Sequence, residues 1–276
     1  MKKKIALLVA MTMVMGMALT GCGEKPAASS AAASSEVAVE DAMVYAVEAG
    51  SAGEAAAEDN GFTYNSVNTQ ADALMEVAAG TSDAAIIDLL MAGAMIGEGI
   101  SYPDLTYTDK LTTEEYGVGC RKGSDLPAFI NAVFAETYAS GAMKMVAENY
   151  GVQESLVEQT ADAFVPAAED SDVAYIQEKG TLLVGITDFA PMDYQNEAGD
   201  WIGFDADMAR IVAQELGVEV EFVVIDWDSK VMELDSKNID AVWNGMTLTD
   251  AVMAAMDCSN AYCNNAQVVV VPATAE

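Results

Sequence analysis

The stretch TLLVGIT at residues 181–187 decides the fold class, because it is an apolar run with the length of one strand. A run of this kind is typical of a parallel strand that is buried on both faces of its sheet. A helix follows over 204–216, with apolar residues along one stripe, and a further strand follows over 218–225. Strands and helices that alternate at this spacing predict α/β units with right-handed crossovers.

The same alternation extends over most of the chain. We expect strands over 43–48, 62–67, 84–87, 105–110, 116–120, 241–244 and 268–271, and helices ending near 60, 79 and 96 and spanning 125–140, 142–150 and 230–236. Ligands of open α/β sheets bind beyond the carboxyl ends of the strands. Residues that directly follow strands are therefore the candidate site residues.

The first 42 residues have the features of an export signal followed by a tether. Three lysines and an apolar run precede Leu-Thr-Gly-Cys at 19–22, which predicts a signal peptide over 1–21. This ending resembles the bacterial lipoprotein box, in which Cys22 would be lipidated and would anchor the protein. The alternative is an ordinary secretory signal with an incidental cysteine. Residues 22–42, rich in Ala and Ser, predict a flexible stalk.

Composition excludes several classes of function. The formal net charge is −32, and it becomes −35 without residues 1–21, which hold three Lys and no acid. Such a field repels nucleic acid and anionic lipid headgroups, so neither is expected as a partner. The chain has no His, the commonest metal ligand and general base. Its remaining cysteines, Cys120, Cys258 and Cys263, match no zinc spacing, and we expect free thiols, with a Cys258–Cys263 disulfide as the alternative.

Several separate motifs resemble one family. One group consists of GITDFAPM (185–192), GFD (203–205), LGV (216–218), WNGMTLTD (243–250) and CSNAY (258–262). The other consists of VEAGSAG (47–53), SDAAIID (82–88) and YGVGCRKGS (116–124). Together they resemble the type II periplasmic-binding-protein fold of amino-acid ABC transporter substrate-binding lipoproteins, the family 3 solute-binding proteins. The resemblance implies an α/β protein of two lobes, each a mostly parallel sheet flanked by helices.

The two groups stand in the opposite order to that of the family, which predicts a circular permutation. A truncated or fused gene fragment is the competing explanation. The predicted organisation is lobe 2 over 43–118 and lobe 1 over 119–276, the latter made of the usual C-terminal helices (119–157), a linker (158–172) and the usual N-terminal half (173–276). We expect residues 268–271 in lobe 1, and a single covalent crossing between lobes near 116–121.

The resemblance also assigns binding roles. It implies that Asp88, which follows an apolar strand, accepts the ammonium group of an amino acid; helix N-capping is the alternative role. Gly50, Ser51 and Ala52 lie between a strand and a helix, where backbone N–H groups favour a ligand carboxylate. Gly245, Met246 and Thr247 should face that loop from the other lobe. Many family members carry Arg five residues after this Thr, but Val252 stands there.

Further candidates surround this core of the site. Glu48, Asp188 and Asp226 follow predicted strands, and they would favour a cationic ligand if they face the cleft; solvated loop positions are the alternative. The aromatic residues Phe189, Trp227 and Trp243 are candidate cleft walls, with core packing as the alternative.

These features predict a lipid-anchored extracytoplasmic binding protein of the bacterial cell membrane, which delivers an amino acid or similar small polar solute to an ABC permease. We expect no catalytic residues, cofactor or metal, and membrane contact through the lipid alone. The alternatives are a dehydratase-like enzyme on the same fold, a sensory domain, and a rearranged product with impaired binding.

Overall fold

The computed structural model describes residues 43–167 and 169–273, which belong to one compact unit. The predicted signal peptide (1–21), the stalk (22–42) and Cys22 lie outside the described residues and stay predictions. Within the described residues, no helix combines the length and the apolar character needed to cross a membrane. The described cysteines Cys120, Cys258 and Cys263 are free.

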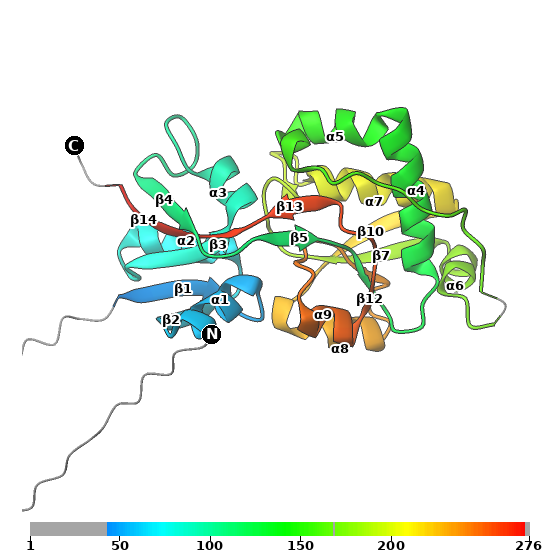
Figure 1. Ribbon diagram of the computed structural model, residues 1–276, viewed down its shortest axis with the longest axis horizontal. Coiled ribbons are helices and arrows are strands. Elements are labelled where there is room, and N and C mark those ends of the chain that lie inside the picture. Colours follow the sequence, from blue (N-terminus) through cyan, green and yellow to red (C-terminus); the bar gives the residue numbers. More distant parts are fainter. Residues whose placement is uncertain (1–42, 168, 274–276) are drawn as a thin grey trace, which may run out of the picture. The chain divides into compact units, whose positions relative to one another are not determined.

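Lobe 2 is built on a five-stranded sheet of order β2-β1-β3-β14-β4 (Figure 1). Its strands are β1 (Val44–Glu48), β2 (Thr63–Val67), β3 (Ala84–Asp88), β4 (Leu105–Lys110) and β14 (Gln267–Pro272). Its helices are α1 (Ala52–Asn60), α2 (Gln70–Ala79) and α3 (Leu89–Met95). β1, β2 and β3 run parallel, and β14 runs antiparallel to both β3 and β4. The carboxyl ends of β1 and β3, at Glu48 and Asp88, therefore share one end of the sheet.

Lobe 1 is built on a second five-stranded sheet, of order β10-β7-β11-β6-β12. Its strands are β6 (Gly119–Cys120), β7 (Thr181–Ile186), β10 (Glu219–Val224), β11 (Ala241–Val242) and β12 (Asp257–Cys258). Its helices are α4 (Leu126–Ser140), α5 (Ala142–Tyr150), α6 (Asp172–Lys179), α7 (Phe204–Leu216), α8 (Lys230–Asp235) and α9 (Asp250–Ala255). Short elements complete it, namely β8 (Tyr194–Gln195), β9 (Trp201–Ile202) and the 3₁₀ turns Gln153–Ser155 and Trp227–Ser229. β10, β7 and β11 run parallel, which is the α/β pattern that the run at 181–187 predicted.

Two strands cross between the sheets. β5 (Glu114–Tyr116) leads from β4 to β6, and β13 (Cys263–Asn265) leads from β12 to β14. They pair antiparallel, Cys263 opposite Tyr116, and run side by side between the sheets in Figure 1. The prediction that residues 268–271 lie in lobe 1 is therefore wrong, and so is the prediction of a single covalent crossing.

The reason for this error is physical. The run QVVVV is apolar throughout, which indicates a central strand but not the sheet to which the strand belongs. The structure places it between β3 and β4, where Val268 and Val270 are fully buried. Ala46 of β1 and Val270 of β14 flank Ala85 of β3 on opposite sides. The start of β1 and the end of β14 thus lie at the same end of the sheet, about 10 Å apart at two strand spacings.

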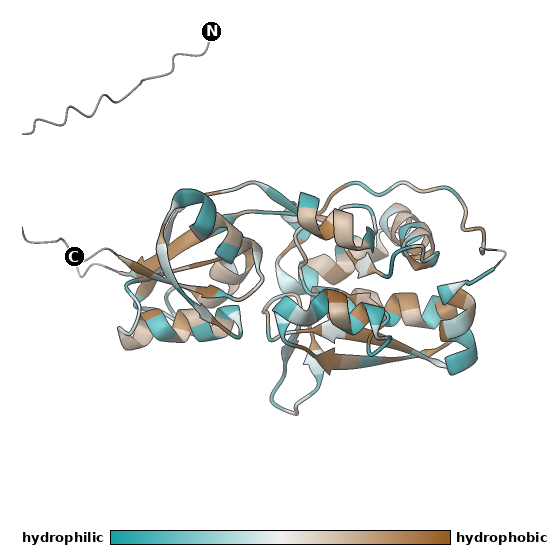
Figure 2. Cartoon of the chain, turned by 90° about the horizontal axis from the view of Figure 1, so that it is seen from below, coloured by the Kyte–Doolittle hydropathy of each residue, from teal (hydrophilic) through white to brown (hydrophobic). Residues whose placement is uncertain are grey.

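Most of the predicted elements are confirmed, since helices and strands occur where the apolar periodicity placed them. Figure 2 shows hydrophobic strands in the interior and helices of mixed character along their length. α7 spans the predicted 204–216, and its apolar stripe is buried at Phe204, Met208, Val212 and Leu216. α6 and α9 were not expected, because each is too short to show a clear apolar periodicity.

Candidate ligand site between the two sheets

A cavity of about 330 Å³ lies between the two lobes. From lobe 2 it is lined by Glu48, Gly50, Ser51, Ala52, Glu54, Ala55, Glu58, Gln70 and Asp88. From lobe 1 it is lined by Trp227, Lys230, Val231, Asn244, Gly245, Met246, Thr247, Thr249, Ala251, Val252 and Ala255. The cavity lies beyond the carboxyl ends of β1 and β3, where open α/β sheets bind ligands.

The structure brings most of the predicted site residues together at this cavity. Those that line it are Glu48, Gly50, Ser51, Ala52, Asp88, Gly245, Met246 and Thr247. Asp188 does not line it and is exposed, as is Asp226. Burial of part of the side chain and the charge of Asp72 raise the pKa of Asp188.

The predicted aromatic walls lie mostly elsewhere. Trp243 is buried in the core of lobe 1, with its ring 5.6 Å from that of Phe134, so its prediction as a wall is wrong. Phe189 is buried behind the site loop rather than in the cavity: a Cβ atom on Gly245 would lie 2.3 Å from Phe189 Cε1. Because Gly245 also has φ +57°, only glycine fits this position. Trp227 does line the cavity.

Asp88 is a buried carboxylate surrounded by donors. Its Oδ1 accepts from Tyr116 Oη at 2.7 Å, from Gln267 Nε2 at 3.0 Å and from Asn265 Nδ2, and its Oδ2 accepts from Gln70 Nε2. Burial, and then the charge of Glu114, raise the pKa of Asp88 to about 7. It stands at the N-cap position of α3 but makes no side-chain capping bond, so the capping alternative is wrong. Among the described residues, Oδ2 has the greater remaining capacity to accept a ligand group.

Glu48 is the second buried acid of the cavity and has fewer partners. Its side chain is 2% exposed, and its Oε1 has no hydrogen-bond partner among the described residues. Burial, and then the charge of Asp88, raise the pKa of Glu48 to about 8, while the charge of Lys230 opposes the shift. β1 and β3 are neighbouring parallel strands, so the two acids end adjacent strands.

The loop at Gly50–Ala52 differs from the predicted anion site. Gly50 N donates to Glu54 Oε2 at 2.8 Å, and Ser51 N donates to the Glu48 carbonyl at 3.2 Å. Ser51 Oγ caps α1 by accepting from Glu54 N at 3.1 Å. The N–H groups of Gly50 and Ser51 are therefore occupied within the protein, and the expectation that they are open to a ligand carboxylate is wrong.

The opposite loop is fixed by bonds within lobe 1 and to β5. Asn244 Nδ2 donates to Thr187 Oγ1 at 2.7 Å, and Thr187 N donates to Asn244 Oδ1 at 3.0 Å. Gly245 N donates to Asp205 Oδ2 at 2.6 Å, and Thr247 Oγ1 donates to Glu114 Oε2 at 3.1 Å. These bonds hold the loop rigid, which is what a preformed site requires.

Lys230 is the one basic residue that lines the cavity within the described part of the chain. Its Nζ donates to the Gly50 carbonyl at 2.9 Å and to the Trp227 carbonyl at 3.0 Å, so it joins the two lobes at this point. Gly50 also packs on lobe 1, because a Cβ atom there would lie 2.7 Å from Asp228 Cα. Burial lowers the pKa of Lys230.

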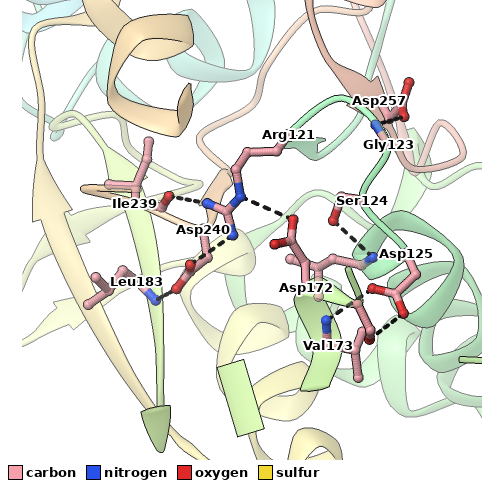
Figure 3. A network of polar contacts seen from close by, with 12 residues as sticks. Arg121, Gly123, Ser124, Asp125, Asp172, Val173, Leu183, Ile239, Asp240 and Asp257 are labelled. Carbon is pink, nitrogen blue, oxygen red and sulfur yellow. Dashed lines mark hydrogen bonds and ion pairs between the residues drawn. The ribbon is translucent and has the colours of Figure 1, made fainter. Parts of the chain in front are cut away.

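Neither arginine of the chain replaces the family arginine. Arg121 donates to Asp172 Oδ2 at 3.0 Å, to Asp240 Oδ1 at 3.1 Å and to the Ile239 carbonyl at 2.7 Å, all within lobe 1 (Figure 3). Arg210 pairs with Asp207 at 3.0 Å. Val252 lines the cavity, so the position five residues after Thr247 brings no positive charge to it.

Several site residues escaped the sequence analysis. Gln70 begins α2, while Asn265 and Gln267 come from β13 and β14 and meet Asp88 across the crossing strands. In the sequence these residues are distinguished only by being polar beside an apolar run. Strands at the surface have the same pattern, so it does not indicate a site. Lys230 carried no signal, since its place at the cavity depends on how the two lobes pack.

Comparison with known proteins finds a family match over part of the chain. Residues 182–276 match the bacterial extracellular solute-binding proteins, family 3. The L-cystine-binding protein TcyJ of Escherichia coli (strain K12) is 35% identical over 96 residues, which are 34% of this chain and 36% of the relative. The arginine-binding extracellular protein ArtP of Bacillus subtilis (strain 168) is 34% identical over 85 residues, 30% of this chain and 33% of the relative. The resemblance stated for the motifs between 185 and 262 is therefore confirmed.

The relatives include an enzyme as well as binding proteins. Cyclohexadienyl dehydratase of Pseudomonas aeruginosa is 32% identical over 82 residues, 29% of this chain and 31% of the relative. Among solved structures, an ancestral cationic amino acid solute binding protein is 38% identical, with a TM-score of 0.29 over 30% of this chain and 36% of the other. The chain spans about a third of the length of the curated relatives it matches.

Proposed function

We propose that this protein is the extracytoplasmic binding component of an ABC importer and that it holds an amino acid between its two lobes. The observation that carries the proposal is the cavity between the lobes, where two buried carboxylates from lobe 2 face a fixed loop of lobe 1. The match of residues 182–276 to extracellular solute-binding proteins supports the same class of function.

The ligand's ammonium group would be held at Asp88. Oδ2 has room for a further donor, and a charge-assisted hydrogen bond there is stronger than a neutral one. The surrounding donors Gln70, Tyr116 and Gln267 fix the carboxylate in place before the ligand arrives. Preorganisation of this kind reduces the entropy that binding costs.

The ligand's carboxylate would be held from lobe 1. Lys230 uses two of its three N–H donors on carbonyl groups and keeps one for an anion. Because Lys230 bonds to Gly50 of lobe 2, the group that meets the carboxylate also joins the lobes. Ligand binding and lobe closure by hinge motion at β5 and β13 would thereby be linked.

Calorimetric titration with a panel of the common amino acids tests this proposal. We expect saturable binding of at least one member with a one-to-one stoichiometry. The isosteric variant Asp88→Asn should weaken that binding, and Glu136→Gln, which removes one exposed acid of α4, is the matched control. Absence of binding across the panel by a folded protein would overturn the proposal.

A dehydratase-like enzyme is the second candidate. The observation in its favour is that Glu48 and Asp88 have pKa values raised to about 8 and about 7 at one cavity, as a general acid requires. A dehydratase also occurs among the relatives. Incubation with a cyclohexadienol, followed by chromatography for a dehydrated product, separates the two functions. Turnover would favour the enzyme, and stable binding without turnover would favour the receptor.

Tethering and delivery complete the proposal. Lipidation at Cys22 would hold the protein outside the cell membrane, close to its permease, through the predicted stalk at 22–42. Cys22→Ser should move the protein from the membrane fraction to the soluble extracytoplasmic fraction. An unmodified leader on the wild-type protein would contradict the anchor.

The order of segments is proposed to be a circular permutation of the family order. The segment that matches the family, 182–276, follows the lobe 2 elements β1 to β4 in this chain. The end of β14 and the start of β1 lie about 10 Å apart at one end of the sheet, which a short connection would span. Both crossing strands are present in either order, so the proposed site does not depend on the order.

A further inference from the structure

We propose that Glu48 is a specificity-determining residue, which makes the cavity select amino acids whose side chain carries an ammonium or guanidinium group. This inference rests on the proposed function and names the ligand class of the same site. In the proposed complex, Asp88 accepts hydrogen bonds from the α-ammonium group and Glu48 accepts them from the second cationic group.

The first support is the charge of the cavity. Its lining residues include the acids Glu48, Glu54, Glu58 and Asp88 but, within the described residues, one base, Lys230. A ligand with a second cation would stabilise the ionised forms of both Glu48 and Asp88, whose pKa values burial raises, whereas a neutral amino acid has only its α-ammonium group to do so.

The second support is that the other acids have partners and Glu48 Oε1 has none. Asp88 accepts several side-chain donors, Glu54 accepts from Gly50 N and Ser66 Oγ, and Glu58 accepts from Tyr64 Oη. Glu48 Oε1 is buried without a partner in the part of the chain that the structure describes. Buried polar atoms are nearly always hydrogen-bonded, so an open acceptor at a cavity calls for a donor from the ligand.

Lys230 does not serve as that donor. Its Nζ atom is bonded to the carbonyl groups of Gly50 and Trp227, and no ion pair joins it to Glu48 among the described residues. The charge of Lys230 reaches Glu48 only at longer range. Oε1 of Glu48 is therefore not bonded to Lys230 and is available to a ligand cation.

The shape of the site suits a ligand with two cationic groups. Glu48 and Asp88 end neighbouring strands, which lie about 4.8 Å apart. Two amino groups joined by a short aliphatic chain can each reach one acid. The methylene groups would lie along Met246, Val231 and Val252, which line the opposite wall. Ligand pockets commonly combine an apolar lining with a few placed polar groups.

Competing ligands of similar shape provide the test. The wild-type protein is titrated calorimetrically with lysine and ornithine and with their neutral isosteres 2-aminoheptanoate and norleucine, and the titrations are repeated with Glu48→Gln. We expect the wild type to prefer lysine or ornithine over the neutral ligands, and Glu48→Gln to lose about tenfold or more in affinity for the cationic ligands. Affinity for the neutral ligands should stay or rise in this variant, and Glu136→Gln should behave as the wild type does.

Two outcomes would overturn the inference while leaving the proposed function intact. One is a wild-type protein that binds neutral amino acids as tightly as cationic ones. The other is an equal loss of affinity for both kinds of ligand in Glu48→Gln, with the fold verified by circular dichroism. A protein that binds no amino acid would overturn the proposed function itself, and the inference with it.

Discussion

One pair of buried acids in lobe 2, Glu48 and Asp88, and one pair in lobe 1, Asp193 and Asp205, differ in what surrounds them. In lobe 2, Glu48 and Asp88 line the cavity. In lobe 1, Asp193 and Asp205 are both fully buried, and neither lines that cavity. Both oxygens of Asp193 lack partners among the described residues, whereas Asp205 Oδ2 accepts from Gly245 N and Tyr262 Oη.

The comparison shows that burial and a raised pKa do not by themselves identify a ligand site. Burial, and then the neighbouring Asp205, raise the pKa of Asp193, and burial raises that of Asp205. The charge of one acid disfavours ionisation of the other. The lobe 2 pair differs in having open space in front of it. We therefore assign ligand contact to the open pair and a structural role to the closed pair.

Asp88→Ala is the change with the largest expected effect. It removes the proposed charge partner of the ligand ammonium and should cost about 2–5 kcal/mol of binding free energy. Calorimetry with the preferred amino acid measures it, and circular dichroism checks that lobe 2 is still folded. A loss of affinity below about threefold, which is under 1 kcal/mol, would remove Asp88 from the site and end the distinction between the pairs.

Asp205→Ala should act chiefly on stability. It leaves the buried donors Gly245 N and Tyr262 Oη without their acceptor, at a cost of about 1–3 kcal/mol in the free energy of unfolding. Urea denaturation measures this cost, and calorimetry on the folded variant should show a smaller change in binding. If binding is lost while stability is retained, the closed pair is part of the ligand site after all.

The dependence of stability on pH should separate the pairs. These acids have pKa values raised above the unfolded values near 4, so the folded state holds more protons at neutral pH. Stability should therefore fall as the pH rises from about 4 to about 8, by up to about 1.4 kcal/mol per pH unit for each group. In the absence of ligand, Asp193→Asn should make the stability decrease less as the pH rises.

A saturating cationic ligand should act on the other pair. The ligand cation should lower the pKa of Glu48. It should therefore reduce the loss of stability that Glu48 causes as the pH rises to about 8. The loss due to Asp193 should persist. Thermal melts across this pH range, with and without ligand, measure both effects, and stability that increases from pH 5 to pH 8 would contradict the assignment for both pairs.

Restoring the family order of segments should have the smallest effect. In a chain with residues 171–276 placed before residues 43–157 and joined by a short Gly/Ser linker, both crossing strands, both acid pairs and the Arg121–Asp172 ion pair are retained. We expect the affinity to change by less than about threefold, or under 1 kcal/mol. A tenfold change in calorimetry would show that the order of the chain matters to the site.

The sequence predicted the local elements well because apolar periodicity determines them. It also predicted Asp88 and Gly245 at the site, since both follow strands that end at the cavity. It misplaced β14, because an apolar run marks a central strand without marking its sheet. It also missed Gln267, whose role depends on that placement.

The sequence also did not predict the packing and hydrogen-bond contacts of several residues at the site. Trp243 and Phe189 looked like cleft walls, but their exposure depends on how α4 and the site loop pack over them. Occupation of Gly50 N by Glu54 depends on the rotamer of one side chain. Such contacts between residues distant in sequence or set by side-chain geometry are not encoded in a local pattern.

The position of β1 and β14 on either side of β3 has a mechanical consequence. Because the start of β1 and the end of β14 lie at the same end of the sheet, a pulling force between residues 44 and 272 would peel these strands away from β3. Their hydrogen bonds would break one after another rather than together, so lobe 2 would yield at low tension while lobe 1 bears little load. Asp88 and Glu48 lie at the far end of the same sheet, and a bound solute would be released only after most of that peeling is complete.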